Sequence, residues 1–283
     1  MKKITVAGVP EHFNHPWHIA LEKGLFAQEG IDLSWIDVPE GTGKMCHMLR
    51  NGETDMAVIL TEGIVKDIAQ GNPSKIVQQY VASPLVWGIH VAANAPFHKM
   101  EDLEQATAAI SREGSGSQLM AYVNAANQGW GTNNLKFKIV HTIDGAVDAL
   151  THGHADYFMW ERFMTKPLVD KGIFRRIADC PTPWPCFVIA VRDEMLASDP
   201  SIVSRILSVI NGVTETFKEI PGIEAVLAAK FHQKKEDIQT WIGMTQWSQS
   251  GLSEDMLNKV QNQLLELSLI DKKGTFAEIV KTL

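Results

Sequence analysis

Cysteine is scarce in this chain. The 283 residues include three cysteines, Cys46, Cys180 and Cys186, and no two of them form a CxxC pair. An odd number of cysteines without metal-ligand spacing predicts neither a disulfide framework nor a zinc cluster, and reduced thiols fit the cytoplasm. For Cys186, the preferred interpretation is a small buried side chain rather than a nucleophile.

Long apolar runs and clustered basic residues are also lacking. No apolar run approaches the roughly 20 residues that a membrane-spanning helix needs. The sequence has 26 Lys and Arg against 33 Asp and Glu, which gives a formal net charge of −7. Binding to nucleic-acid phosphates needs clusters of Lys and Arg. We therefore expect neither membrane insertion nor a nucleic-acid partner.

The first residues, MKKITVAGVP, pass from two lysines into a strand pattern. They lack the apolar stretch and the small-residue cleavage site of a secretion signal. We expect a cytoplasmic protein on this basis. A periplasmic or cell-surface location would follow if a signal had been removed.

Strand and helix patterns alternate along the first 82 residues. The strand patterns are ITVAGV, IDLSWIDV, DMAVIL and KIVQQYVA, and helical patterns separate them. This alternation is typical of βαβ units and predicts a mainly parallel sheet. A second series of the same kind starts at NAPFHKMEDL, and the chain after Arg192 is mainly helical in pattern.

A chain of 283 residues is long enough for two lobes with separate cores. The long strands VWGIHVAA and CFVIAV are placed where the chain would cross from one lobe to the other and return. We therefore predict an α/β protein with two mixed, mainly parallel sheets, joined by hinge strands at about 87–91 and 187–191. The predicted lobes are 1–88 with 191–283, and an inserted lobe at 89–190.

Several runs, in their order along the chain, resemble a known family. They are GLFAQEGIDL, NGETDMAV, FHKMEDLEQATAAISREGSGSQ, DGAVDAL with GHADYFMW, and VRDEMLASDPSIVSRIL. Together they resemble the substrate-binding proteins of ABC transporters with the type II periplasmic-binding-protein fold, in the group for nitrate, sulfonates, taurine and thiamin-pyrimidine precursors. The resemblance covers nearly the whole chain. It implies a protein that closes two lobes on a small molecule and delivers it to an ABC transporter.

The enzymatic branch of this group, the fungal thiamin-pyrimidine synthase, has a CCCFC run where this chain has WPCFV. Only Cys186 matches. Thiolates can hold iron, whereas the other side chains of WPCFV cannot. This comparison argues against the iron chemistry of that branch, and we predict no cofactor, no metal and no catalytic residues for this chain.

Ligands of open α/β sheets bind beyond the carboxyl ends of the strands, near helix N-termini. In GTGK, Gly41 and Gly43 would let backbone N–H groups approach a ligand, and Thr42 would add a hydroxyl. In the SGSQ run, Ser115 or Ser117 is a helix cap before an apolar helix. Both loops would favour a carboxylate, phosphate or carbonyl oxygen. The alternatives are a turn glycine and a cap without a ligand.

Three acids, Glu11, Glu62 and Glu161, follow predicted strands. Carboxylates at one ligand site would repel an anion and favour an amine, a protonated heterocycle or hydroxyl groups. Solvated rim acids are the alternative. The aromatic residues of the same loops can stack on a planar ring or cover a cation, or can be part of the core.

The predicted ligand-binding residues are Glu11, His12, Phe13, Asn14, Trp17, Gly41, Thr42, Gly43, Thr61, Glu62, Ser115, Gly116, Ser117, Trp160, Glu161 and Trp184. Histidines recur at His12, His15 and His18, and again in HGH. Pro16 interrupts the helix that would align the first group, and no carboxylate or cysteine completes a zinc-binding spacing. Loop histidines that form hydrogen bonds are the preferred interpretation.

Two hypotheses of different classes follow. The first is a solute-binding protein for a heterocyclic or amine-containing metabolite. The second is a cytoplasmic enzyme of the same fold, acting on a thiamin-pyrimidine-like or other small metabolite, with Glu11, Glu62 or His12 as acid or base. A ligand sensor that acts through another protein is a third. The sequence shows no helix-turn-helix for direct DNA binding.

Overall fold

A computed structural model describes residues 2–283 of the chain. Its internal contacts divide these residues into two compact units. Unit 1 comprises the residues up to Ser83, Trp184–Ala229 and Gln239–Leu283, and unit 2 comprises Pro84–Pro183 and Lys230–Ile238. The chain therefore changes unit a few residues before the predicted boundaries after 88 and 190. A short C-terminal segment also joins unit 2.

Unit 1 contains a five-stranded sheet in the order β2-β1-β3-β10-β4. Its strands are β1 (Lys2–Gly8), β2 (Ile31–Asp37), β3 (Met56–Leu60), β4 (Ser74–Val81) and β10 (Phe187–Arg192). β1 pairs in parallel with β2 and β3, while β10 is antiparallel to both β3 and β4. The predicted mixed, mainly parallel sheet is confirmed.

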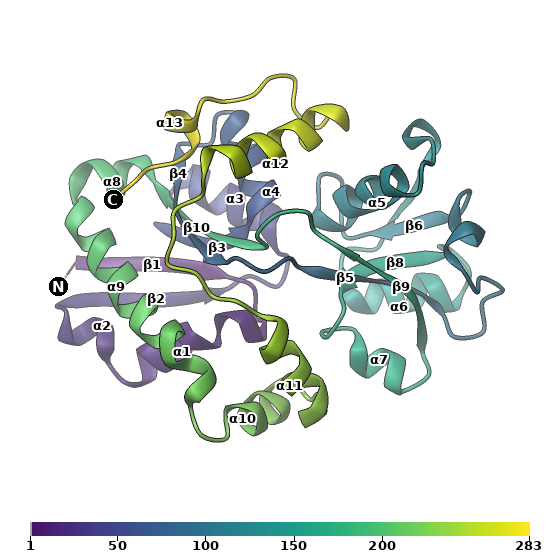
Figure 1. The fold of residues 1–283 in the computed structure, drawn as a ribbon, viewed down its shortest axis with the longest axis horizontal. Coiled ribbons are helices and arrows are strands. Elements are labelled where there is room, and N and C mark those ends of the chain that lie inside the picture. Colours follow the sequence, from purple (N-terminus) through teal and green to yellow (C-terminus); the bar gives the residue numbers. More distant parts are fainter. Residues whose placement is uncertain (1) are drawn as a thin grey trace. The chain divides into compact units, whose positions relative to one another are not determined.

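The apolar run at residues 56–60 forms β3, the central strand of this sheet. Met56, Ala57, Val58 and Ile59 are all fully buried, because neighbouring strands and helices cover both faces. Figure 1 shows that the purple-to-blue and green-to-yellow parts of the chain together build this unit. Its described helices are α1 (His15–Glu22), α2 (Leu25–Gln28), α3 (Thr42–Asn51), α4 (Thr61–Ala69), α8 (Asp193–Ser198), α9 (Pro200–Thr216), α10 (Ile223–Lys230), α12 (Glu254–Glu266) and α13 (Phe276–Ile279), with the 3-10 turns η1 (His12–Asn14) and η4 (Phe217–Glu219).

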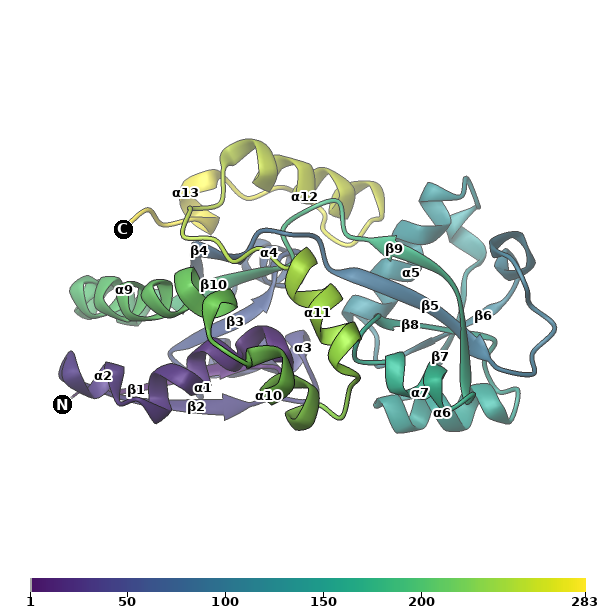
Figure 2. The same cartoon turned by 60° about the horizontal axis from the view of Figure 1, so that its bottom comes forward.

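The C-terminal part of the chain covers the outer edge of β4. The Lys281 N–H donates to the Ile76 carbonyl at 2.9 Å, and the Ser248 N–H donates to the Tyr80 carbonyl at 3.0 Å. α12 packs on α4, and α13 packs on α4 and β4, as both ribbon views show (Figures 1 and 2). These contacts cap a strand edge that would otherwise present unpaired backbone groups.

Unit 2 contains a second five-stranded sheet in the order β7-β6-β8-β5-β9. β6 is parallel to β7 and β8, whereas β5 is antiparallel to β8 and β9. The described elements of this unit are β5 (Val86–Ala92), η2 (Met100–Leu103), β6 (Thr107–Ile110), α5 (Gly116–Asn127), η3 (Thr132–Asn134), β7 (Lys136–Ile139), α6 (Ile143–Thr151), β8 (Tyr157–Glu161), α7 (Lys166–Asp170) and β9 (Phe174–Pro181).

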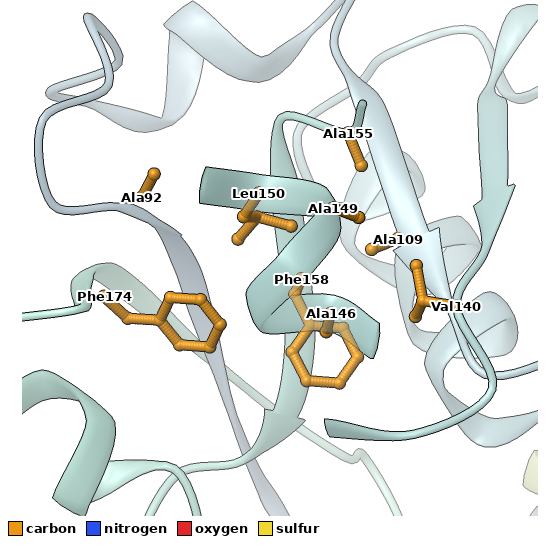
Figure 3. Packing of buried hydrophobic residues seen from close by; sticks show 9 residues of the cluster. All are labelled: Ala92, Ala109, Val140, Ala146, Ala149, Leu150, Ala155, Phe158 and Phe174. Atoms are coloured by element: carbon orange, nitrogen blue, oxygen red, sulfur yellow. The ribbon is translucent and has the colours of Figure 1, made fainter. Parts of the chain in front are cut away.

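Small and aromatic side chains form a core cluster in unit 2. Phe158 of β8 lies with Ala146, Ala149 and Leu150 of α6, and Phe174 closes one side (Figure 3). The alanines allow α6 to approach the sheet closely, and the two rings fill the remaining space. This packing uses side chains of unit 2 alone, so the unit has a core of its own.

The two predicted hinge strands are integral parts of separate sheets. β5 pairs along its length with β8 and β9 in unit 2, and β10 pairs with β3 and β4 in unit 1. Helix α11 (Lys235–Met244) lies in the region predicted to be mainly helical but was not predicted as a separate helix, and its residues divide between the units. Within residues 2–283, no helix combines the length and apolar character needed to cross a membrane.

Candidate functional site

Five segments of unit 1 meet at one edge of its sheet. The parallel strands β1, β2, β3 and β4 end there, and the antiparallel β10 begins there. The strand order reverses beside β1, which is the position where open α/β sheets bind ligands. We call the segments 9–15, 38–44, 61–63, 82–83 and 184–186 the strand-end loops of unit 1. They carry ten of the sixteen predicted residues, and Trp17 lies just beyond the first loop.

Glu62 and Trp184 form a buried hydrogen-bonded pair within these loops. The indole Nε1 of Trp184 donates to Oε2 of Glu62 at 2.7 Å, and the two residues are 2% and 1% exposed. Thr61 fixes the same contact, since its hydroxyl donates to the Pro185 carbonyl at 2.5 Å. The start of α4 is thereby tied to the segment that precedes β10. Sequence reasoning selected all three residues but not this pairing.

Burial raises the pKa of Glu62 to about 7. The loss of solvation disfavours the charged carboxylate, and the Trp184 N–H and the backbone N–H of Glu62 itself offset only part of that rise. Oε1 of Glu62 is buried and has no hydrogen-bond partner among the described side chains and backbone groups. A buried acceptor without a partner is costly, so this oxygen is poised to bind an N–H or O–H group.

Glu11 and His12 follow β1, the strand beside β3. Burial raises the pKa of the half-buried Glu11 to about 7 and lowers the pKa of the fully buried His12 to about 3. His12 is therefore neutral at pH 7 and cannot carry a positive charge to a ligand. Two carboxyl groups after adjacent strands thus titrate near neutral pH.

Aromatic residues hold the turn η1 in place. The Phe13 carbonyl accepts from the Tyr80 hydroxyl at 2.9 Å and from Trp247 Nε1 at 3.4 Å. The Phe13 ring lies 5.2 Å from Phe187 and 5.1 Å from Trp241, measured between centroids. Phe13 is buried and helps to position its neighbours Glu11 and His12.

Asn14 and Trp17 also have structural contacts. Nδ2 of Asn14 donates to the Val9 carbonyl at 2.9 Å, which closes the turn after β1. Trp17 is 0% exposed, and its ring packs between Phe26 and Trp35 in the core. These placements favour a structural role for both residues.

The GTGK loop leads into α3 through a glycine conformation. Gly41 is the N-cap with φ 76° and ψ −158°, a region that only glycine readily adopts. Gly41 has no side chain to cap the helix, so the first N–H groups of α3, at Thr42 and Gly43, face no side-chain cap. The methyl of Thr42 lies against Gly63, where an added Cβ would approach to 2.2 Å. The loops after β2 and β3 are therefore in contact.

In unit 2, the predicted residues lie at the strand ends of its own sheet. Ser115 is the N-cap of α5, and its hydroxyl lies 3.0 Å from that of Ser117. The Ser117 hydroxyl also accepts from the Ser111 N–H at 3.0 Å, so it binds the end of β6 to the start of α5. Gly116 is the first residue of the helix. These contacts agree with the capping alternative and leave the helix N-terminus at the sheet edge.

Glu161 and Trp160 end β8. Oε2 of Glu161 accepts from the backbone N–H groups of Phe163 and Met164 at 2.9 and 2.7 Å, which folds the turn after the strand. Trp160 is half-buried and packs against Phe158 and Trp87. Glu161 therefore shapes its own loop.

No cluster of three or more metal-ligating side chains occurs among the described residues. The three cysteines are buried thiols, and burial raises the pKa of Cys180 to about 11. Two residues near the site were missed by sequence reasoning, Trp241 and Trp247. The apolar spacing of Ile238, Trp241 and Ile242 indicates a helix, but it does not show what the helix packs on.

Comparison with solved structures identifies the fold. The Candida albicans CA3427 gene product, described as defining a new family with the generic periplasmic binding protein fold, is 23% identical, with 100% of this chain and 97% of that chain covered and a TM-score of 0.92. The alkanesulfonate-binding protein SsuA from Xanthomonas axonopodis pv. citri, bound to MOPS, is 15% identical over 99% and 98% of the chains, with a TM-score of 0.84. The ligand-binding component of an ABC-type import system from Staphylococcus aureus, with zinc bound, is 12% identical over 100% and 97%, with a TM-score of 0.78.

The chain thus has the two-lobe type II periplasmic-binding-protein fold, as the sequence predicted. Within that class, residues 87–180 match the family model described as Ca3427-like PBP. No curated protein matches the chain.

Proposed function

We propose that the protein is a solute-binding protein for a small organic ligand that carries N–H groups, such as an amine or a nitrogen heterocycle. The observation that supports this most directly is the buried carboxyl of Glu62, whose Oε1 has no partner while Trp184 holds Oε2. A ligand N–H would satisfy this oxygen.

The charges of the unit 1 strand-end loops favour such a ligand over an anion. The loops contain Glu11, Glu40 and Glu62, and their single Lys or Arg is Lys44. The ammonium of Lys44 lies 3.3 Å from Glu53 and is already paired. A sulfonate would find carboxyl groups here and no unpaired cation of these loops, so it would be bound less well than an amine.

The relatives support the class of function but not the ligand. Structural neighbours include a sulfonate-binding protein and a component of an ABC-type import system, which makes an ABC transporter the proposed partner. The hinge closure predicted from the sequence is also part of this proposal. Added ligand should reduce the radius of gyration in small-angle X-ray scattering if the closure occurs.

Native mass spectrometry of the purified protein, compared with its denatured mass, would reveal a co-purifying ligand. A thermal-shift panel of amines, pyrimidines and sulfonates would then test the class. Ligand at about 100 times Kd should stabilise the fold by about 2.7 kcal/mol. We expect amines or heterocycles to stabilise the protein. The stabilisation should be weaker in Glu62→Gln and unchanged in the exposed control Glu104→Gln. Stabilisation by sulfonates alone would refute the proposed ligand class.

A second candidate function is an enzyme of the same fold, since Glu11 and Glu62 have pKa values near 7. A general acid or base works best with a pKa close to the working pH. His12, with its pKa of about 3, is a poor base at that pH. Turnover of a bound metabolite that is lost in Glu62→Gln, with binding retained, would support the enzyme. Unchanged ligand recovered after long incubation would exclude it.

A further inference from the structure

Helix α11 divides its residues between the two compact units. Lys235–Ile238 cluster with unit 2, and Gln239–Met244 cluster with unit 1. Asp237 and Trp241 are four residues apart, so they lie on the same face one turn from each other. The first belongs to an ion-pair cluster of unit 2, and the second to the aromatic packing around η1 of unit 1.

The ion-pair cluster joins α7 to the segment Lys230–Ile238. Nζ of Lys166 lies 3.4 Å from Oδ2 of Asp237 and also pairs with Asp170. Nζ of Lys234 lies 3.0 Å from the other oxygen of Asp170. The hydrogen bond from Lys166 lowers the pKa of Asp170, and the same bond raises the pKa of Lys166. Two lysines and two aspartates therefore alternate in one network, which holds better than isolated pairs.

The side chains of this network are partly protected from water. Those of Lys166 and Asp237 are 26% and 20% exposed, whereas Lys234 is 62% exposed. Lys166 pairs with both aspartates and connects Asp237 of α11 to the rest of the network. Its loss would leave the first turn of α11 without its partner in α7.

At the next turn of α11, the Trp241 ring packs on the residues that follow β1. The ring is 1% exposed and lies 4.1 Å from the His12 ring, centroid to centroid, with an angle of 39° between the planes. It also makes edge contacts with Phe13 and Trp247. A displacement of Trp241 would therefore loosen η1 and, with it, Glu11 and His12.

We propose that Lys166 and Asp237 are positioning residues for the ligand site, acting through α11 on η1. The network fixes the first turn of α11, the helix backbone carries that order to Trp241, and Trp241 holds η1 against the sheet. The functional meaning rests on the proposed function, in which Glu11 belongs to the ligand site. The coupling itself is a property of the ligand-free protein and can be measured without a ligand.

Amide hydrogen exchange, followed by mass spectrometry on the full ligand-free chain at low salt, tests the coupling. In Asp237→Asn and Lys166→Met, peptides covering 230–241 and those covering 11–15 should both exchange about threefold faster, the size expected for partly exposed ion pairs. Lys166→Arg keeps the charge and should retain near wild-type protection. Asp271→Asn, at an exposed loop carboxylate, controls for the change in net charge.

Two comparisons sharpen the result. Asp237→Asn also removes a negative charge from the first turn of a helix, whereas Lys166→Met does not. Faster exchange in both variants would therefore be due to the loss of the ion pair. About 0.5 M NaCl should speed exchange in the wild type and have little effect in Lys166→Met, because salt screens the pair.

Trp241→Phe tests the direction of the coupling. It should speed exchange at 11–15 and, because coupling is reciprocal, also at 230–238. The proposal would be overturned if the charge variants exchange faster at 230–241 but not at 11–15. It would also be overturned if exchange is unchanged in both segments. Because no ligand is used, either failure would leave the proposed function to be judged by its own ligand screen.

Discussion

Glu62 has an unusual environment for a carboxyl group. The residue is 1% exposed, with one carboxyl oxygen bound by Trp184 and the other without a hydrogen-bond partner among residues 2–283. The pKa of about 7 in the folded protein lies above the ordinary value of 4.5. A group of this kind binds its proton more tightly in the folded state than in the unfolded state, which links the stability of the protein to pH.

We expect Glu62→Gln to stabilise the protein at alkaline pH. With a raised pKa, the contribution of Glu62 to stability is fully present below about pH 4.5 and is lost as the pH rises through about 7. At 1.36 kcal/mol per pKa unit, the loss is about 3 kcal/mol. Glutamine stays neutral and can still accept from Trp184. Urea denaturation should therefore show that, between about pH 5 and pH 8, the free energy of unfolding of the variant rises relative to that of the wild type by an amount of this order.

The exposed control Glu104→Gln should follow the wild type across the same pH range. Glu11 contributes a pH dependence of its own, but it is present in both proteins and cancels in the difference. Parallel pH profiles for wild type and Glu62→Gln would contradict the raised pKa.

Trp184→Phe should destabilise the protein, and more at high pH than at low pH. The substitution keeps an aromatic ring but removes the donor to Oε2 of Glu62, which leaves a buried acceptor unpaired. Such a loss costs about 1–3 kcal/mol, and the cost grows when the acceptor is charged. Chemical denaturation at two pH values would measure it. The half-buried Trp160→Phe is the matched ring substitution, and equal effects of both would show that packing alone explains the loss.

At the scale of elements, the first residues of helices α3 and α4 form part of the strand-end loops of unit 1. α3 begins after a glycine and α4 begins with Thr61 and Glu62, and the two starts touch through Thr42 and Gly63. The close approach brings the loops after β2 and β3 together. A methyl group at position 63 would collide with Thr42, so this contact requires glycine there.

We expect Gly41→Ala to destabilise α3 and the loop before it. The backbone of Gly41, at φ 76° and ψ −158°, is strained for any residue with a Cβ, even though nothing lies within 4 Å of that atom. The expected cost is about 1–3 kcal/mol in the free energy of unfolding. Gly212→Ala is the control, because Gly212 lies inside α9 with open space around it and should gain up to about 1 kcal/mol. A neutral Gly41→Ala would indicate that the loop readily adopts another conformation.

At the scale of the whole molecule, ligand affinity should depend on pH. A cationic amine prefers ionised carboxyl groups, and a group with a pKa of about 7 becomes about tenfold more ionised between pH 6 and pH 8. Affinity for an amine that stabilises the protein should rise up to about tenfold over this interval. Calorimetry in buffers of different ionisation enthalpy would also detect the protons released on binding. Affinity that falls as the pH rises would point to an anionic ligand instead.

Much of the fold could be predicted from local patterns. The alternating and continuous apolar runs located the strands, because a side chain's burial follows from its position along a strand. Asp199 and Ser253 are residue types that favour helix N-caps, and both cap α9 and α12 through their side chains. α11 was not recognised as a separate helix because no Ser, Thr, Asn or Asp directly precedes Lys235 to mark its start.

The candidate site was predictable only as a set of loops. Strand ends and glycines identified Glu11, Gly41 and Glu62, since these features are local in the sequence. What each residue does depends on partners far along the chain. Trp17 and Trp184 look alike in sequence, yet one packs in the core and the other binds Glu62 across 122 positions.

The sequence alone determined the class of fold and the acidic, cysteine-poor character of the chain, because composition and periodicity are local properties. Only the tertiary structure decided where the chain passes between units, at Ser83 and Pro183, and that α11 links two environments. It also decided the protonation of Glu62 and His12, because a pKa is set by the atoms that surround a group and not by its neighbours in the sequence.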